Sequence, residues 1–426
     1  MPTDHAAALP GHPFFHYQDG TLFAEAVALT ELAQQHGTPL FVYSQAALAH
    51  ALDAYQQGFA GRNVGIHYAV KANSNLSILQ FFAEQGCGFD IVSAGELLRV
   101  LQAGATPASV VFSGVGKTRA EMQLALRTGI GCFNVESEAE LAVLNEEAGK
   151  LQIRAPISLR VNPDVDPQTH PYISTGLKNN KFGIPHERAL QVFQQAAALP
   201  WLEVRGIDCH IGSQILSERP FLDALDKLLD LVAAVERCGI ALHHIDCGGG
   251  LGIQYQTEVP PQAGALWQKM FAHADARGYG DRRFLIEPGR SLVGNAGVCL
   301  TEVLYLKPGE DKHFCIVDAA MNDLPRPAMY EAFHAISPVV PRAGTPVTTY
   351  DVVGPVCESG DWLGRDRALA VQAGDWLAVG SAGAYCMSMA SNYNSRPRAA
   401  EILVHGSEHR VIRQRESFAQ MIETER

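Results

Sequence analysis

The chain has 426 residues, which is too long for one small domain and suits a large barrel with a second domain. Its residues are 47% hydrophobic and 18% charged, as in an ordinary globular protein. The net charge of -12 argues against partners such as nucleic acid or an anionic membrane surface.

The first residues lack the basic and apolar segments of a signal peptide, and no apolar run approaches ~20 residues. We therefore expect neither a leader nor a membrane span.

Nine cysteines without a CxxC pair argue against a disulfide framework and against a zinc site, and they favour a reducing cytoplasm. Most are expected to be small core residues. Cys357 is the exception, because a polar, turn-rich loop surrounds it.

The first 35 residues or so are predicted to form short strands that pack on another domain. Asp19-Gly20 stands between two apolar runs, which is a hairpin signal. From about residue 38 to 290, short apolar runs alternate with amphipathic stretches. The predicted strands are 64–70, 88–92, 110–113, 131–135, 157–161, 204–211, 243–247 and 284–287. The predicted helices are 44–57, 76–85, 94–102, 119–127, 138–147, 187–198, 221–238 and 261–277.

Alternating strands and helices indicate parallel strands joined by helical crossovers. Eight such units predict a (β/α)8 TIM-like barrel over residues 36–295, with an open doubly wound sheet as the alternative. A barrel gathers the residues that follow its strands at one face, and those residues here are polar or glycine. They are Lys71, Asp90, Ser113, Glu136, Asn162, His210, Gly248 and Glu287.

Two further segments depart from this alternation. A long polar loop, 162–183, includes Lys178 and Asn179, and it is predicted to be a lid or an interface arm. Beyond about residue 295 the helical period fades. The predicted strands there are 298–306, 313–317, 347–353, 369–371, 375–379, 400–404 and 409–412. We expect an all-β sandwich or barrel domain formed by 1–35 and 296–426, so that N-terminal strands complete the C-terminal domain.

Lys71 ends the apolar run 65–70, which is too short for a helix. A lysine beside low-dielectric walls has a lowered amine pKa and can form a Schiff base. The alternative is a surface lysine that snorkels into water.

Other strand ends carry groups that could bind an anion or a flat ring. The glycines at 248–250 and Gly289 can present backbone N–H groups to an anion such as a phosphate, or can simply form tight turns. Glu287 can keep a pyridine nitrogen protonated, or can be a structural ion-pair partner. His210 can stack on a flat ring with Ser213 at the phosphate, or can be a core histidine. Each signal alone is weak, but a barrel would bring all of them together.

With these motifs in place, the chain resembles the fold-type III pyridoxal-phosphate-dependent decarboxylases, and most closely the diaminopimelate decarboxylase family. The resemblance covers about residues 38–404. It rests on YAVKAN at 68–73, RVNP at 160–163, KFG at 181–183, HIGSQ at 210–214, GGG at 248–250, EPGRS at 287–291, GPVCES at 354–359 and AGAY at 382–385.

The resemblance implies pyridoxal 5'-phosphate bound covalently to Lys71 and a homodimer with shared active sites. It implies decarboxylation of meso-2,6-diaminopimelate at its D-centre to L-lysine and CO2, the last step of lysine biosynthesis. The implied catalytic residues are Lys71, His210, Glu287 and the proton donor Cys357. The cofactor-binding residues are Lys71, Asp90, His210, Ser213, Gly249, Gly250, Glu287, Pro288, Gly289, Arg290 and Tyr385. The substrate-binding residues are Arg290, Arg326, Tyr330, Glu358 and Tyr385.

Several rival functions remain. Decarboxylases of ornithine, carboxynorspermidine or another D-amino acid share the chemistry, but Arg290 and Arg326 favour a substrate with a distal carboxylate. Arg326 alone could equally be a surface arginine. Amino-acid racemases of this fold are usually shorter and lack Cys357-Glu358 in this setting. A catalytically inactive regulator would be expected to lose Lys71 or Cys357, and both are present.

Overall fold

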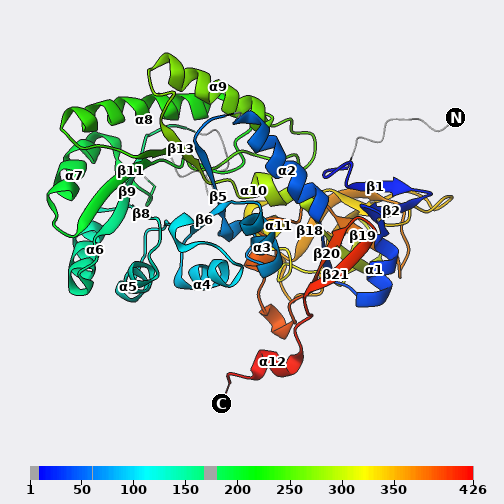
Figure 1. The fold of residues 1–426 in the computed structure, drawn as a ribbon. Helices are drawn as coiled ribbons and strands as arrows, with labels where there is room; N and C mark the ends of the chain where they lie inside the picture. Colours follow the sequence, from blue (N-terminus) through cyan, green and yellow to red (C-terminus); the bar gives the residue numbers. More distant parts are fainter. Residues whose placement is uncertain (1–8, 60, 167–179, 426) are drawn as a thin grey trace. The chain divides into compact units, whose positions relative to one another are not determined.

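The computed structural model describes residues 9–59, 61–166 and 180–425, and it divides into two units (Figure 1). The barrel unit comprises Asp53–Gly252 and Pro260–Ser291. The β unit comprises Met1–Leu52, Ile253–Val259 and Leu292–Arg426. No helix among the described residues is long and apolar enough to cross a membrane.

Eight parallel strands form the barrel unit. They are β5 (Val64–Ala69), β6 (Gly88–Ile91), β7 (Val110–Phe112), β8 (Cys132–Val135), β9 (Ala155–Asn162), β11 (Leu202–Asp208), β12 (His244–Asp246) and β13 (Arg283–Ile286). The sheet closes because β9 pairs with both β8 and β11, and a short strand, β10 (Ile184–Pro185), also pairs with β9. The barrel prediction is therefore confirmed, and the open doubly wound sheet is excluded.

Helices surround the strands, as Figure 1 shows. They are α3 (Leu76–Glu84), α4 (Ala94–Gln102), α5 (Arg119–Thr128), α6 (Glu138–Leu151), α7 (His186–Ala198), α8 (Arg219–Arg237) and α9 (Ala263–Ala276). Short polar side chains begin several of them. Ser93, Thr118 and Ser137 each accept a hydrogen bond from a backbone N–H three residues later, which satisfies a donor that the first turn leaves free. These caps end the loops that follow the strands and so fix where those loops run.

The main sheet of the β unit has the strand order β18-β17-β15-β14-β4-β20-β21. Its strands are β4 (Leu40–Ser44), β14 (Gly297–Lys307), β15 (His313–Val317), β17 (Thr348–Val353), β18 (Trp362–Leu369), β20 (Ala400–His405) and β21 (Glu408–Arg413). Beside it, β16 (Ile336–Pro338) pairs with β19 (Trp376–Val379), which pairs with β14. The helices of this unit include α1 (Leu29–His36), α11 (Arg326–Tyr330) and α12 (Phe418–Ile422).

The predicted N-terminal hairpin is present. β1 (Phe15–Gln18) pairs with β2 (Thr21–Ala24), which pairs with β3 (Val27–Ala28). Asp19 and Gly20 form the two-residue turn, both with positive φ. Phe15 and Leu22 share one buried cluster with Val298 and Ile402, so the N-terminal strands do complete the β unit.

Two predicted strands need correction. The strand predicted at 369–371 is wrong, because β18 runs from Trp362 to Leu369 and carries exposed charges that hide it in the sequence. The strand predicted at 204–211 ends at Asp208, so His210 lies in the following loop. The division between the units differs from the predicted boundaries of 36–295. β4 is apolar on both faces and hydrogen-bonds to β14 and β20, which places it in the β unit.

α2 (Gln45–Gly58) follows β4 directly, and the division into units falls within this helix. The segment Ile253–Val259 also belongs to the β unit although the barrel sequence encloses it.

Candidate active site

Lys71 lies in a short 3₁₀ turn, Val70–Ala72, directly after β5. Its Nζ donates to Oδ2 of Asp90 at 2.7 Å, and Asp90 lies on the neighbouring strand β6. The lysine side chain is 39% exposed while that of Asp90 is fully buried. The other oxygen of Asp90, Oδ1, has no hydrogen-bond partner among the described residues. A buried carboxylate therefore holds the amine at the carboxyl end of the barrel, which distinguishes Lys71 from a lysine that merely reaches into solvent.

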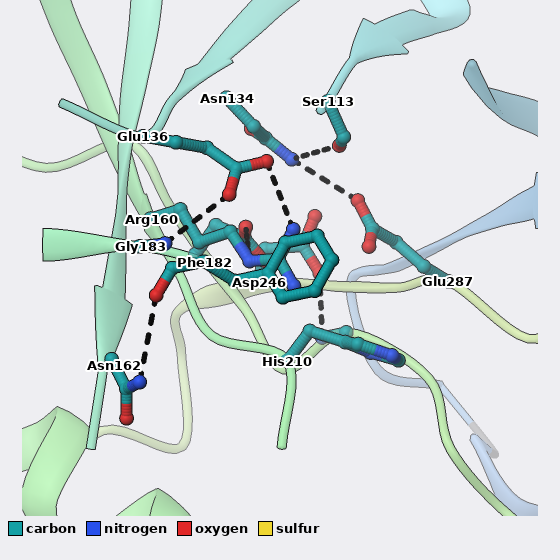
Figure 2. A network of polar contacts seen from close by, with 12 residues as sticks. Ser113, Asn134, Glu136, Arg160, Asn162, Phe182, Gly183, His210, Asp246 and Glu287 are labelled. Carbon is teal, nitrogen blue, oxygen red and sulfur yellow. Dashed lines mark hydrogen bonds and ion pairs between the residues drawn. The ribbon is translucent and has the colours of Figure 1, made fainter. Parts of the chain in front are cut away.

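Glu287 follows β13 and is buried. Nδ2 of Asn134, on β8, donates to Oε1 of Glu287 and to Oγ of Ser113, each at 3.1 Å (Figure 2). This bridge joins residues from three separate strand ends. It holds the Glu287 carboxyl in a fixed position inside the barrel.

Two more carboxyl groups lie beside Glu287. One oxygen from each of Asp208, Asp246 and Glu287 lies within 4.8 Å of the others. Burial, followed by mutual repulsion, raises the pKa of Glu287 and of Asp208 well above their usual values. Burial raises the pKa of Asp246 to about 7. The cluster therefore retains protons near neutral pH instead of carrying three negative charges.

Arg160, on β9, is buried against these acids. Burial lowers its pKa, but attraction to Glu136 and Asp208 outweighs that effect and leaves it raised. Its Nη1 donates to Oε1 of Glu136 at 3.0 Å, and Oε2 of Glu136 accepts from the N–H of Gly183 at 3.2 Å (Figure 2). Of the predicted 162–183 loop, Lys178 and Asn179 lie outside the described residues.

His210 stands in the loop after β11. The N–H of Gly249 donates to its Nδ1 at 3.1 Å, so this nitrogen is an acceptor and the ring hydrogen of the neutral form sits on Nε2. Burial, together with the nearby positive charges of Arg160 and Lys71, lowers the pKa of His210 well below its usual value. His210 therefore presents a neutral, flat ring at the same end of the barrel.

Tight backbone packing accounts for the glycines of the two loops. A Cβ on Gly249 would lie 2.2 Å from the carbonyl oxygen of Glu287. Gly250 has φ +112° and little room beside the carbonyl of Gly212. A Cβ on Gly289 would lie 3.1 Å from the Cβ atoms of Ala69 and Ala72. The loops after β12 and β13 thus pack directly against each other and against the turn that carries Lys71.

Arg290 begins α10 (Arg290–Val293) and is buried. Its Nη2 donates to Oγ of Ser213 at 3.0 Å, which joins the loop after β13 to the loop after β11. The carbonyl of Pro288 accepts from the N–H of Ala69 at 3.1 Å, at the end of β5. The barrel unit therefore brings together all of the predicted cofactor-binding residues except Tyr385.

The residues present fit pyridoxal phosphate. An amine, a neutral ring and a buried proton-holding carboxyl lie at one end of the barrel, beside a hydroxyl and a guanidinium that suit a phosphate. Two buried carboxylate oxygens, Asp90 Oδ1 and Asp246 Oδ2, have no hydrogen-bond partner among the described residues. They could therefore accept hydrogen bonds from a bound group.

The remaining predicted residues belong to the β unit. Arg326 and Tyr330 stand four residues apart on α11, hence on one face of its single turn. Cys357 and Glu358 are exposed, whereas most of the other cysteines are buried. Tyr385 is half-buried with φ +57°, a strained conformation for a residue with a large side chain.

The sequence interpretation missed Asn134, Asp208 and Asp246 as parts of the site. Each is a polar side chain within a predicted barrel strand, Asn134 in 131–135, Asp208 in 204–211 and Asp246 in 243–247, and this placement was the available signal. Arg160 was quoted within a motif but was given no role, although it lies against Glu136 and Asp208.

Comparisons with known proteins agree with this geometry. Residues 45–294 match the family model for the pyridoxal binding domain of pyridoxal-dependent decarboxylases. Diaminopimelate decarboxylases of Vibrio cholerae and Pseudomonas aeruginosa are each 54% identical, with 96% of this chain and 97% of each relative covered. The Helicobacter pylori diaminopimelate decarboxylase complexed with L-lysine aligns with a TM-score of 0.89 at 42% identity, over 93% of this chain and 99% of that one.

A second solved relative, from M. jannaschii and also in complex with L-lysine, gives a TM-score of 0.93 at 36% identity. The alignment covers 98% of this chain and 99% of the M. jannaschii chain. Near-complete coverage at these identities means that both units, and not the barrel alone, match the relatives. This chain therefore belongs to the pyridoxal-dependent decarboxylases and, within them, to the diaminopimelate decarboxylase family.

Proposed function

We propose that this chain decarboxylates meso-2,6-diaminopimelate at its D-centre, releasing CO2 and L-lysine, as the last step of lysine biosynthesis. The observation that carries the proposal is the meeting of Lys71, His210 and Glu287 at the carboxyl end of one barrel. The relatives named diaminopimelate decarboxylase support this choice of substrate over other amino acids.

Pyridoxal phosphate, when bound, supplies the electron-withdrawing ring that takes up the electrons of the broken carbon–carboxylate bond. The chain would hold it covalently through Nζ of Lys71, with Asp90 keeping the amine in place. His210 would stack its neutral ring on the cofactor, and Glu287 would face the ring nitrogen. The groups proposed to hold the phosphate and line the remainder of the pocket are Ser213, Gly249, Gly250, Pro288, Gly289, Arg290 and Tyr385.

The substrate has two amino-acid ends, and only one of them reacts. Arg290 and Arg326 would bind carboxylate, because a guanidinium can donate two parallel hydrogen bonds to it. Glu358 would bind the ammonium of the distal end. Tyr330, on the same turn as Arg326, and Tyr385 would complete the contacts to the substrate.

Cys357 is the proposed proton donor. Its thiol is exposed, and its backbone N–H donates to Oδ1 of Asn394 at 2.8 Å, which fixes the loop that carries it. A thiol in this position would deliver a proton from Sγ to the carbon that lost CO2.

We infer that the protein works as a homodimer with shared active sites. The exposure of Cys357 and Glu358 in the single chain supports this inference, because both carry proposed functions yet face solvent. All nine cysteines are free thiols, which suits the reducing cytoplasm as the place of action.

The decisive experiment is to incubate purified protein and pyridoxal phosphate with meso-diaminopimelate and to measure CO2 and L-lysine in equal amounts. Lys71→Ala should give neither product. Borohydride should fix the cofactor to the wild-type peptide that contains residue 71, and it should fix none to this variant. Two control compounds each lack one carboxylate. L-lysine lacks the carboxylate at the reacting end, and ornithine lacks the carboxylate at the distal end. Turnover of ornithine but not of diaminopimelate would refute the proposal.

A further inference from the structure

Arg326 has unusual surroundings for a buried arginine. It is only 6% exposed, and its guanidinium lies 4.6 Å from the ring centroid of Tyr255. Among the residues that the structure describes, no carboxylate forms an ion pair with it. A buried charge without a counter-charge is costly, so this guanidinium suits an anion that arrives from outside.

A histidine, and not an acid, is the hydrogen-bond acceptor of Arg326. The Nη1 of Arg326 lies 2.8 Å from Nε2 of His334, and the His334 side chain is completely buried. On its other side, Nδ1 of His334 lies 2.8 Å from the carbonyl oxygen of Gly380. The His334 ring also meets the ring of Tyr255 edge to face, with centroids 5.2 Å apart.

These two contacts determine where the ring hydrogen is. A carbonyl oxygen only accepts and a guanidinium only donates. Nδ1 must therefore carry the hydrogen that is donated to Gly380, and Nε2 must accept from Arg326. The main chain at Gly380 thus sets the tautomer of His334, and the tautomer in turn orients the guanidinium.

We propose that His334 is a positioning residue that fixes the Arg326 guanidinium for the distal carboxylate of the substrate. This inference rests on the proposed function. A neutral acceptor orients the guanidinium without cancelling its charge, whereas an aspartate or glutamate in this place would compete with the substrate carboxylate. Within the described part of the chain only Nη1 of Arg326 is held by a hydrogen bond, so its other N–H groups can form two parallel hydrogen bonds to a carboxylate.

The test compares holoenzymes with leucine, asparagine or glutamine at position 334. Leucine removes both ring contacts at similar volume. Glutamine can still offer an acceptor where Nε2 lies, and asparagine reaches only toward Gly380. His334→Leu and His334→Asn should raise the KM for diaminopimelate about 10- to 100-fold, as expected for one lost hydrogen bond to a charged group. Because the distal contact binds ground and transition states alike, kcat should change less than about threefold.

Binding of L-lysine gives a readout that does not depend on turnover. L-lysine retains the distal amino-acid end, so its calorimetric Kd should rise by the same factor as KM in the leucine and asparagine variants. Inhibition by 1,5-diaminopentane, which has no carboxylate, should be unchanged. His334→Gln should stay within about threefold of wild type in all of these measurements.

His313→Leu is the matched control. His313 lies in the same unit and meets Tyr350 edge to face, with centroids 6.2 Å apart, but it holds no arginine among the residues that the structure covers. The KM of His313→Leu for diaminopimelate should equal that of wild type. If His334→Leu binds L-lysine as wild type does, the positioning role is overturned. If it does not fold, equal Kd values for His334→Asn and His334→Gln overturn the role instead. Failure of wild type to convert diaminopimelate would refute the proposed function, which is a separate result.

Discussion

At the scale of single residues, the site places groups where their neighbours set their protonation. Lys71 meets a buried carboxylate, and Glu287 lies among acids that raise its pKa. Burial and the charges of Arg160 and Lys71 lower the pKa of His210, and a backbone N–H donates to its Nδ1. The sequence predicted these three because each one ends an apolar run. Asp246 could not be assigned in this way, because its importance comes from neighbours on other strands.

Asp246 makes the cofactor-free protein sensitive to pH. Its pKa rises from the usual 3.8 to about 7 on folding, mainly by burial, so the folded state binds a proton more tightly than the unfolded state. This stabilisation is fully present below the unfolded pKa and is lost as the pH rises through about 7. Asp246→Asn should therefore reduce the fall in Tm of the cofactor-free protein between pH 5 and pH 8.

Asparagine at 246 can still accept the hydrogen bond from the N–H of Gly248. The exposed Asp281→Asn is the control and should follow the wild-type Tm at both pH values. An equal fall in Tm for wild type and Asp246→Asn would show that this carboxyl is ionised throughout the range.

Cys357 is expected to affect the rate and not the binding of substrate. Cys357→Ala should lower kcat by ~10²–10⁴-fold, the usual contribution of a general acid, with little change in KM. Cys357→Ser should be slower than wild type, because a hydroxyl is a weaker acid than a thiol. Cys238→Ala removes the other exposed thiol and should keep the wild-type rate. A wild-type kcat for Cys357→Ala would assign the proton to another donor.

At the scale of elements, the barrel strands were predictable because parallel strands are covered on both faces and appear as continuous apolar runs. β6, β7 and β8 are buried at every position. β4 is equally buried but was not predicted as a strand. The predicted boundary at residue 36 placed its residues in the barrel domain, and an apolar run does not specify its pairing partner. His334 lies in an irregular segment between α11 and β16 and had no periodic signal.

The loop after β12 permits a test of packing between elements. Gly249→Ala would place a methyl group 2.2 Å from the carbonyl oxygen of Glu287, so the loop must shift. We expect a loss of about 1–3 kcal/mol in the free energy of unfolding of the cofactor-free protein, measured by denaturant titration. Gly116→Ala, with nothing within 4 Å and an ordinary φ, should stay within ~0.5 kcal/mol of wild type. Equal stability for the two variants would contradict the close packing seen here.

At the scale of the whole molecule, the proposed functions are divided between two units. The barrel unit carries the residues proposed for the cofactor, and the β unit carries Cys357, Glu358 and Arg326. If the sites are shared in a homodimer, Lys71 of one copy acts with Cys357 of the other. Neither Lys71→Ala nor Cys357→Ala should then have appreciable activity alone, but a heterodimer of the two contains one intact site.

Mixing the two inactive variants in equal amounts, with subunit exchange verified, should therefore restore roughly a quarter of the wild-type activity, because half of the dimers are mixed and each has one working site. The matched control mixes wild type with the double variant Lys71→Ala/Cys357→Ala. Shared sites leave both sites of the mixed dimer defective, so activity should fall to roughly a quarter, whereas separate sites would leave roughly half. No recovery in the first mixture together with half activity in the second would place Lys71 and Cys357 of one copy in the same site.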